Sequence, residues 1–474
     1  MTPGGLAPTR GGRALEWWAF AIVMAWGAYQ CFWNLAGANM GADEPVYVQA
    51  GWDYLHGDVS SNQEHPPVAK YLMGLTQTLF GHGLLSGRVT AAVAAFAVGL
   101  VLYFWLRREL GWVGALAAAG FWLVLPHGMP GSVRLDRMAL LEPIAIFFAV
   151  AAFAAAWQWM RGRAWWWLAL SAAAMALSVT SKVSSAVLVP ALLLVVVLRR
   201  RLVPVLLGIG LMAVVGLAVA VAVYWPVGLG DSIAYMVRYQ SEHDLQGHLT
   251  TVAGVAYQFP PWWSNLWFWF DGMGVLPVLV LLAGSIASLW SRRWALLGVM
   301  AAAVGGLWLF HLVIADVSLS HYYYAWVWPF CVTAGAGIGA LFAVGRRRTT
   351  RAVAHGTAAV ILTAALVCGV YTSAVVAQER ASGMALVLGV LNDRGLGAGS
   401  VYVGGMAEWE YTYLLGGRQS TDPDDPAVVA FALKDQVRFP LDPALVARLD
   451  EHPETFERLE IDDVTLYLVR ADED

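Results

Sequence analysis

Long apolar runs separated by short clusters of arginine are the feature that most constrains this chain. Apolar runs close to the length that a helix needs to cross a bilayer, about 20 residues, recur along most of the sequence. Only 13% of the 474 residues are charged, which is too few to cover a soluble protein of this size and excludes a disordered chain. The sequence therefore predicts an α-helical polytopic membrane protein with about eleven transmembrane helices. The expected helices cover residues 15–35, 86–106, 112–129, 138–160, 164–181, 183–198, 202–225, 273–290, 294–314, 325–344 and 352–377.

The arginine clusters predict the orientation of these helices. Short cytoplasmic loops carry an excess of Lys and Arg, and eleven crossings place every cluster on the same side. The clusters lie at residues 10–13, 107–108, 161–163, 199–201, 292–293 and 346–351. We therefore expect a multi-pass protein of the plasma membrane with a cytoplasmic N-terminus and an external C-terminus. A crossing by segment 67–83 would break this alternation, so we expect that segment to form a helix along the outer surface.

Residues 379–474 differ in composition from the rest of the chain. They hold 19 acidic and 8 basic residues, whereas residues 1–378 carry a net charge of +7. Short segments of helical and of alternating apolar pattern replace the long runs. The expected helices are 381–394 and 442–449, and the expected strands are 400–403, 428–433 and 464–469. The chain is thus predicted to have a transmembrane domain over 1–378 and a small extracytoplasmic α/β domain over 379–474.

The outer face is where chemistry is expected, because the inner loops hold little but arginine. The two longest outer loops cover residues 36–85 and 226–272. The first of them begins with Asp43 and Glu44, directly after the first predicted helix. A carboxylate partly withdrawn from water at the membrane surface has a raised pKa, which suits a general base. A cation ligand or a solvated start of the loop explains the acidic pair equally well.

Lys70 follows a rigid stretch of the first outer loop. The sequence His65-Pro66-Pro67 precedes it by a few residues and predicts the start of a helix, because proline is tolerated in the first turn. Lys70 then lies near the positive end of that helix, where a phosphate binds favourably. A lysine that extends to the lipid headgroups is the alternative explanation.

Further cations lie on the outer side beyond the first loop. Arg134 and Arg137, with Asp136 between them, lie in a predicted outer loop, although arginine is usually enriched in the cytoplasmic loops. Arginine binds phosphate through two parallel hydrogen bonds. Lys182 is the only charged residue in the stretch 164–198. A lone lysine between two membrane helices needs an anionic partner or water. These residues are therefore candidates for binding an anionic group.

Aromatic residues gather on the same face. Residues 260–270 read PPWWSNLWFWF, and His321 and Tyr322 precede a predicted helix at its outer end. A tryptophan-rich membrane interface explains most of these residues, but His321 is not part of that pattern. The acidic and imidazole side chains at 243–248 have a spacing that matches no standard metal site. The sequence therefore assigns no cofactor, and it neither predicts nor excludes a divalent metal ion.

Acids, cations and an aromatic loop on one face suggest a site for an anionic lipid and a polar acceptor. With these residues the chain resembles the GT-C membrane glycosyltransferases that use polyprenyl-monophosphate sugars, of the protein O-mannosyltransferase and lipid A aminoarabinose transferase type. The resemblance covers about residues 15–345, and the tail lies outside it. It depends on Asp43-Glu44, the run from His65 to Leu72, Arg134-Leu135-Asp136, Ser181-Lys182 and His321-Tyr322-Tyr323.

The resemblance implies an inverting transfer of a hexosyl or pentosyl group from a polyprenyl-phosphate sugar to a hydroxyl acceptor. The acceptor is a protein, a lipid or a glycan of the cell envelope, and the MIR-type module of eukaryotic O-mannosyltransferases is missing. Asp43 is expected to be the general base, and Glu44 to position the acceptor or the base. The residues expected to bind the donor phosphate or sugar are Lys182, Arg134, Asp136, Arg137, Lys70, His65, His321 and Tyr322.

Two other classes of function fit a polytopic chain. A transporter or flippase of lipid-linked sugars needs charges or broken helices near the bilayer midplane and repeated halves, and the sequence shows neither. A non-catalytic scaffold leaves Asp43 and Lys182 without a role. The net charge of −4 argues against a nucleic-acid partner. The expected partners are the polyprenyl-phosphate sugar, membrane lipid and the acceptor.

Overall fold

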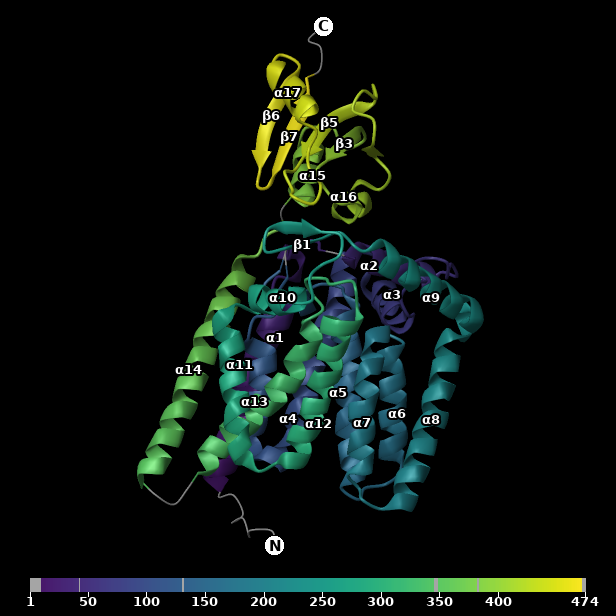
Figure 1. Ribbon diagram of the computed structural model, residues 1–474. Coiled ribbons are helices and arrows are strands. Elements are labelled where there is room, and N and C mark those ends of the chain that lie inside the picture. Colours follow the sequence, from purple (N-terminus) through teal and green to yellow (C-terminus); the bar gives the residue numbers. More distant parts are fainter. Residues whose placement is uncertain (1–9, 42, 130–131, 345–347, 382, 471–474) are drawn as a thin grey trace.

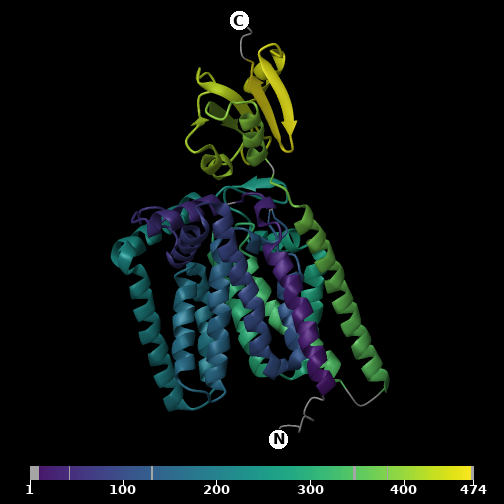
Figure 2. The same ribbon diagram turned by 180° about the vertical axis from the view of Figure 1, so that it is seen from behind.

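The computed structural model describes residues 10–41, 43–129, 132–344, 348–381 and 383–470. Most of them form helices that run side by side in a bundle, and a small sheet domain lies at one end of it (Figures 1 and 2). The N-terminus lies at the opposite end. The long elements of the bundle are α1 (Arg10–Phe32), α4 (Leu84–Val124), α5 (Leu141–Met160), α6 (Trp166–Val179), η3 (Val183–Leu188), α7 (Val189–Val197), α8 (Leu202–Tyr224), α10 (Ser264–Met273), α11 (Val275–Ala287), α12 (Trp294–Leu309), α13 (Tyr324–Ala343) and α14 (Arg348–Gln378).

Each of the apolar runs expected to cross the membrane is mainly helical in the structure. By length and composition, six described helices can cross a bilayer on their own, and a seventh can if α10 and α11, bent by 104°, form one crossing. Helix α6 and the η3–α7 pair are apolar but shorter. The helical membrane fold is therefore confirmed, whereas the number of about eleven crossings stays a prediction.

Helix α4 contains two of the predicted runs. Gly111 has φ 74° and ψ 169°, a backbone conformation that glycine adopts far more readily than other residues. The chain reverses there, so that Trp122 Nε1 donates a hydrogen bond to the Ala95 carbonyl at 2.8 Å across the two arms. Arg107, close to this reversal, forms an ion pair with Glu16 of α1. The reversal thus separates the two runs as the arginine rule predicted.

The turns that carry arginine clusters lie at one end of the bundle. The α7–α8 and α11–α12 connections, the end of α13 and the start of α14 all lie at the end of the bundle where α1 begins (Figure 1), while Arg346 and Arg347 lie outside the described residues. The C-terminal domain lies at the other end, together with the helices α2 (Glu44–Leu55), α3 (Val68–Phe80) and α9 (Leu229–Gln246). Helix α3 has 13 residues, too few to cross a bilayer, as expected for segment 67–83. Which end faces the cytoplasm stays a prediction.

The C-terminal domain is a five-stranded mixed sheet with the strand order β4-β3-β5-β7-β6. Strand β3 pairs in parallel with β4 and β5, while β7 is antiparallel to β5 and β6. Its elements are α15 (Met384–Asp393), β3 (Ser400–Gly404), α16 (Glu408–Leu415), β4 (Gln419–Ser420), β5 (Val428–Leu433), α17 (Pro443–Glu451), β6 (Phe456–Ile461) and β7 (Val464–Val469). All five elements expected from the pattern are present. Helix α16 and strands β4 and β6 were missed.

Two small cores hold this sheet between helices. In β5, Ala430 and Ala432 pack with α15 on one face, whereas Phe431 and Leu433 pack with α17 on the other. This division follows from the side-chain alternation of a strand. The Asp442 carboxylate accepts a hydrogen bond from the Ala444 N–H at 2.9 Å and caps α17.

Candidate active site

Three charged or titratable side chains meet at the end of the bundle near the C-terminal domain. Glu142 lies in the first turn of α5, Lys182 directly before η3, and His321 shortly before α13. Lys182 and His321 both pair with the Glu142 carboxylate, and His321 Nε2 lies 3.0 Å from Oε1. The Lys182 ammonium also lies 4.7 Å from the centroid of the Tyr322 ring. The structure thus brings together Lys182, His321 and Tyr322, which the sequence assigned to the donor site.

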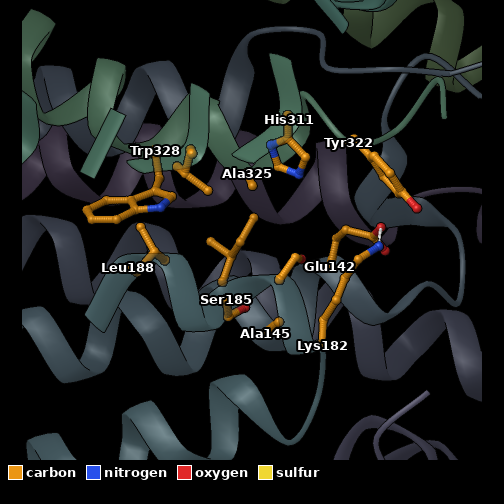
Figure 3. A pocket seen from close by; sticks show the side chains of 12 residues that line it. Glu142, Ala145, Lys182, Ser185, Leu188, His311, Tyr322, Ala325 and Trp328 are labelled. Carbon is orange, nitrogen blue, oxygen red and sulfur yellow. Dashed lines mark hydrogen bonds and ion pairs between the residues drawn. The ribbon is translucent and has the colours of Figure 1, made fainter. Parts of the chain in front are cut away.

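A pocket extends from this cluster between α5, η3, α12 and α13 (Figure 3). Glu142, Lys182 and Tyr322 line one end of it, and apolar side chains such as Leu188 and Trp328 line the other. Glu142 Oε2 is buried and has no hydrogen-bond partner among the described residues. The pocket therefore joins a charged end to an apolar wall between helices.

Asp43 lies directly before α2 and is half-buried. The Tyr47 hydroxyl donates a hydrogen bond to its Oδ2 at 3.0 Å. The Asp43 charge acts on both His65 and Tyr322, the second of which lines the pocket. No ion pair to Asp43 is found within the described part of the chain. Asp43 thus differs from Glu44, Asp136 and Glu142, which all form ion pairs.

His65 lies in the segment before α3. Its ring makes an edge contact with Tyr47, with 5.4 Å between centroids. Burial, together with the charges of Lys182 and Lys70, lowers the pKa of His65 to about 4 although Asp43 acts in the opposite direction. The imidazole is therefore neutral near pH 7 and can both donate and accept hydrogen bonds.

Lys70 contacts the loop that carries His65 and does not line the pocket. Its ammonium is fully buried and donates to the Tyr54 hydroxyl at 3.0 Å, to the His65 carbonyl at 2.8 Å and to the Asn62 carbonyl. Burial lowers its pKa to about 7. Lys70 thus fixes the loop that carries His65.

Glu44, the second member of the acidic pair, is turned away from Asp43 into the protein. Its carboxylate is fully buried and pairs with Arg88 through two hydrogen bonds of 2.7 and 2.9 Å. The Ala139 N–H also donates to Glu44 Oε1 at 2.8 Å. These contacts connect the start of α2 to α4 and to the segment before α5.

Arg134 and Asp136 form a closed ion pair below the surface. Both side chains are fully buried, and the guanidinium donates to the two Asp136 oxygens at 3.0 and 2.6 Å. The remaining N–H groups of Arg134 face the carbonyls of Leu123 and Leu125 and the Cys31 sulfur. No donor of Arg134 is left for a phosphate.

Arg137 holds the start of the linker to the C-terminal domain. Its side chain is fully buried and pairs with Glu379 at 2.9 Å, directly after α14. It also donates to the carbonyls of Gln30 and Asn34 at 3.0 and 2.8 Å. Arg134, Asp136 and Arg137 therefore do not join the Glu142–Lys182–His321 cluster.

The partners of these cations were the residues that sequence reasoning missed. Glu142 was given no role from the sequence, and Glu379 was counted only as part of an acidic tail. A carboxylate in the first turn of an apolar helix was the available signal for Glu142. Within the described ranges, no group of three His, Cys, Asp or Glu side chains is close enough to hold a metal ion.

Residues 64–225 match the family model of dolichyl-phosphate-mannose-protein mannosyltransferases. The polyprenol-phosphate-mannose–protein mannosyltransferase of Mycolicibacterium smegmatis is 34% identical over 154 residues, which are 30% of this chain and 29% of that protein. The enzyme of the same description from Mycobacterium tuberculosis is 28% identical over 172 residues, 33% of this chain and 32% of its own length. The chain thus aligns with about a third of the length of these relatives.

Two solved structures share the fold over most of the chain. ArnT from Cupriavidus metallidurans bound to undecaprenyl phosphate has a TM-score of 0.64 and 13% identity, and the match covers 98% of this chain and 99% of ArnT. The oligosaccharyltransferase AglB from Archaeoglobus fulgidus, in complex with an inhibitory peptide and a dolichol-phosphate, has a TM-score of 0.55 and 13% identity over 90% of this chain and 70% of AglB. These structures confirm the GT-C fold, and the family model and the mycobacterial relatives confirm the resemblance to polyprenyl-phosphate-dependent glycosyltransferases.

Proposed function

We propose that this chain transfers a sugar from a polyprenyl-monophosphate donor to a hydroxyl group, with inversion at the anomeric carbon. The observation that supports this most directly is the pocket that begins at Lys182 and Glu142 and becomes apolar between the helices. A polyprenyl phosphate has the same two parts, an anionic head and an apolar chain. The reaction takes place at the end of the bundle that carries the C-terminal domain, which the arginine rule places outside the cytoplasm.

Asp43 acts as the general base in this reaction. It removes the proton of the acceptor hydroxyl as the oxygen attacks the anomeric carbon. The new carbon–oxygen bond forms while the bond to the phosphate oxygen breaks, and its electron pair leaves with the polyprenyl phosphate. Tyr47 holds the Asp43 carboxylate in place through its 3.0 Å hydrogen bond.

Lys182 and His321 stabilise the leaving phosphate. Charge that develops on a leaving group is stabilised most by cations and donors that are already in position. Both side chains are held in place by Glu142, whose free Oε2 can accept a hydrogen bond from the donor sugar. Arg134, Arg137 and Lys70 have structural roles in this proposal, and Glu44 positions the base through its ion pair with Arg88.

We further propose that the sugar is mannose and that the acceptor hydroxyl belongs to a polypeptide. The support is the family model over residues 64–225 and the two mycobacterial relatives, all of which are named for mannose transfer to protein. The matching segment includes Lys70, Arg134 and Lys182.

The test is transfer from a panel of polyprenyl-phosphate sugars to a threonine-containing peptide by the purified protein. Asp43→Asn should reduce the rate at least a hundredfold, because general-base catalysis contributes about 10²–10⁴-fold, and should leave undecaprenyl-phosphate affinity within twofold of wild type. Asp58→Asn is the matched control, since Asp58 is exposed and contacts Ser60 in the same outer loop. Transfer by Asp43→Asn at the wild-type rate would refute the assignment of the base.

A further inference from the structure

A tight turn of the C-terminal domain contacts the membrane domain at His248. The Phe439 N–H donates to the Gln436 carbonyl at 3.1 Å and closes a turn over residues 436–439. Val437 and Arg438 lie at its tip, after strand β5. Val437 is exposed, while Arg438 is half-buried.

An ion-pair network holds the base of this turn. The Lys434 ammonium lies 2.9 Å from Glu410 and 2.8 Å from Asp463, and the Gln436 amide donates to Glu410 at 2.9 Å. Glu410 belongs to α16, which packs against α2 of the membrane domain. The turn is therefore fixed relative to both domains.

The Arg438 side chain leaves its own domain and points toward the membrane domain. Its Nη2 lies 3.4 Å from Nε2 of His248, in the segment before β1 (Thr250–Val252). Its Nε is buried and has no hydrogen-bond partner among the described residues. The Asp43 charge acts on both Arg438 and His248. The guanidinium thus lies against His248 of the membrane domain with an unused donor.

The C-terminal domain is strongly acidic, and several of its cations form ion pairs within it, whereas Arg418 donates to the Leu415 and Gly397 carbonyls. Arg394, Arg448 and Arg458 pair with carboxylates of the same domain at 2.9, 2.6 and 2.6 Å. Within the described ranges, Arg438 has no such ion pair. An arginine that forms no ion pair and keeps an unpartnered buried donor is suited to bind a carboxylate of a ligand.

We propose that Arg438 is an acceptor-binding residue, which binds a carboxylate on the acceptor polypeptide close to the hydroxyl that Asp43 deprotonates. This inference rests on the proposed function and adds the acceptor class: a serine or threonine flanked by an acidic residue. The domain that carries the turn lies beyond the end of the helix bundle (Figures 1 and 2). A group that meets Arg438 therefore arrives from the aqueous side, as a polypeptide does.

The test compares two fluorescent threonine peptides that differ only in a Glu or a Gln beside the threonine. Binding to the full-length protein is measured by anisotropy without donor, and transfer is measured separately with polyprenyl-phosphate mannose. Wild type should bind the Glu peptide about tenfold more tightly, as expected for one charge-assisted hydrogen bond. Arg438→Gln should remove this preference without weakening the Gln peptide, and Arg438→Lys should retain part of it.

Arg448→Gln is the matched control, because Arg448 is exposed on the same domain and pairs with Asp424. It should bind both peptides as wild type does. Equal binding of the two peptides by wild type, or an equal loss of both in Arg438→Gln, would overturn the inference. If Arg438→Gln binds vesicles of anionic lipid more weakly but binds both peptides as wild type does, the inference is also overturned, since that result indicates a lipid acceptor. Arg438-dependent peptide binding without sugar transfer would support the inference and refute the proposed function.

Discussion

Replacing Lys182 by methionine tests the donor site most directly. The substitution keeps the aliphatic part of the side chain and removes only the ammonium, which lines the pocket beside Tyr322. Glu142 keeps its 3.0 Å contact with His321, so the local packing is retained. The side chain of Lys182 is 13% exposed, and the substitution therefore places little new apolar surface in water.

The expected loss of affinity follows from the contacts of the ammonium. One hydrogen bond to a charged group contributes about 1.5–3 kcal/mol, which corresponds to about a 10- to 150-fold change in a dissociation constant. Without Lys182, the Glu142 carboxylate also faces the phosphate with less compensation. We therefore expect the loss of affinity for undecaprenyl phosphate to lie near the upper end of this range, about 150-fold.

The assay is competition binding of undecaprenyl phosphate to the purified protein, with the uncharged undecaprenol as a second ligand. Lys182→Met should weaken binding of the phosphate and leave binding of the alcohol unchanged. Lys434→Met is the control, because Lys434 pairs with two carboxylates of the C-terminal domain. Phosphate affinity within twofold of wild type, or an equal loss for the alcohol, would refute the assignment of Lys182.

Three further outcomes are expected. Arg134→Met should lower the melting temperature, because it leaves Asp136 buried without its partner at a cost of about 3–5 kcal/mol. The folded fraction should keep its affinity for undecaprenyl phosphate. A loss of affinity at unchanged stability would instead assign Arg134 to the donor site. Burial lowers the pKa of Lys70 from 10.5 to about 7, so the unfolded chain binds more protons between pH 7 and 10 and the melting temperature should rise with pH there. Lys70→Met should flatten that rise, and an unchanged pH profile in this variant would contradict the pKa. A reporter fused after Asp474 should be detected outside the cell, and a cytoplasmic signal would reverse the orientation.

The helical part of the fold was predictable because the bilayer limits the choices of the chain. A run of apolar residues near the length of α5 or α13 has few alternatives to a helix, and the arginines at 107–108 marked the reversal inside α4. The short strands β4 and β6 were not predictable, because the two residues of β4 carry no period and no β6 side chain is fully buried. The packing of α16 against α2 depends on tertiary contacts, which local pattern does not encode.

The candidate site was only partly predictable for a related reason. Lys182, His321 and Tyr322 were assigned to one site and do lie together, whereas Arg134 and Arg137 are paired inside the protein. A sequence shows that a cation lies beside a membrane helix, but not which anion neutralises it. The partner of Arg137 is Glu379, 242 residues away, and no local spacing indicates such a pair.

The energetics of burial distinguish the arginines that are paired inside the protein from the cations that can bind a substrate. A fully buried guanidinium is tolerated only when nearly all of its donors have partners, and Arg134 meets this condition through Asp136 and two carbonyls. A phosphate could replace those partners only by breaking the ion pair. Lys182 is less buried and shares its one carboxylate with His321, so an incoming phosphate can gain a contact there without leaving a buried charge alone. The same criterion selects Arg438, whose buried Nε has no partner among the described residues, and this is why two cations from different domains are expected to meet the two substrates.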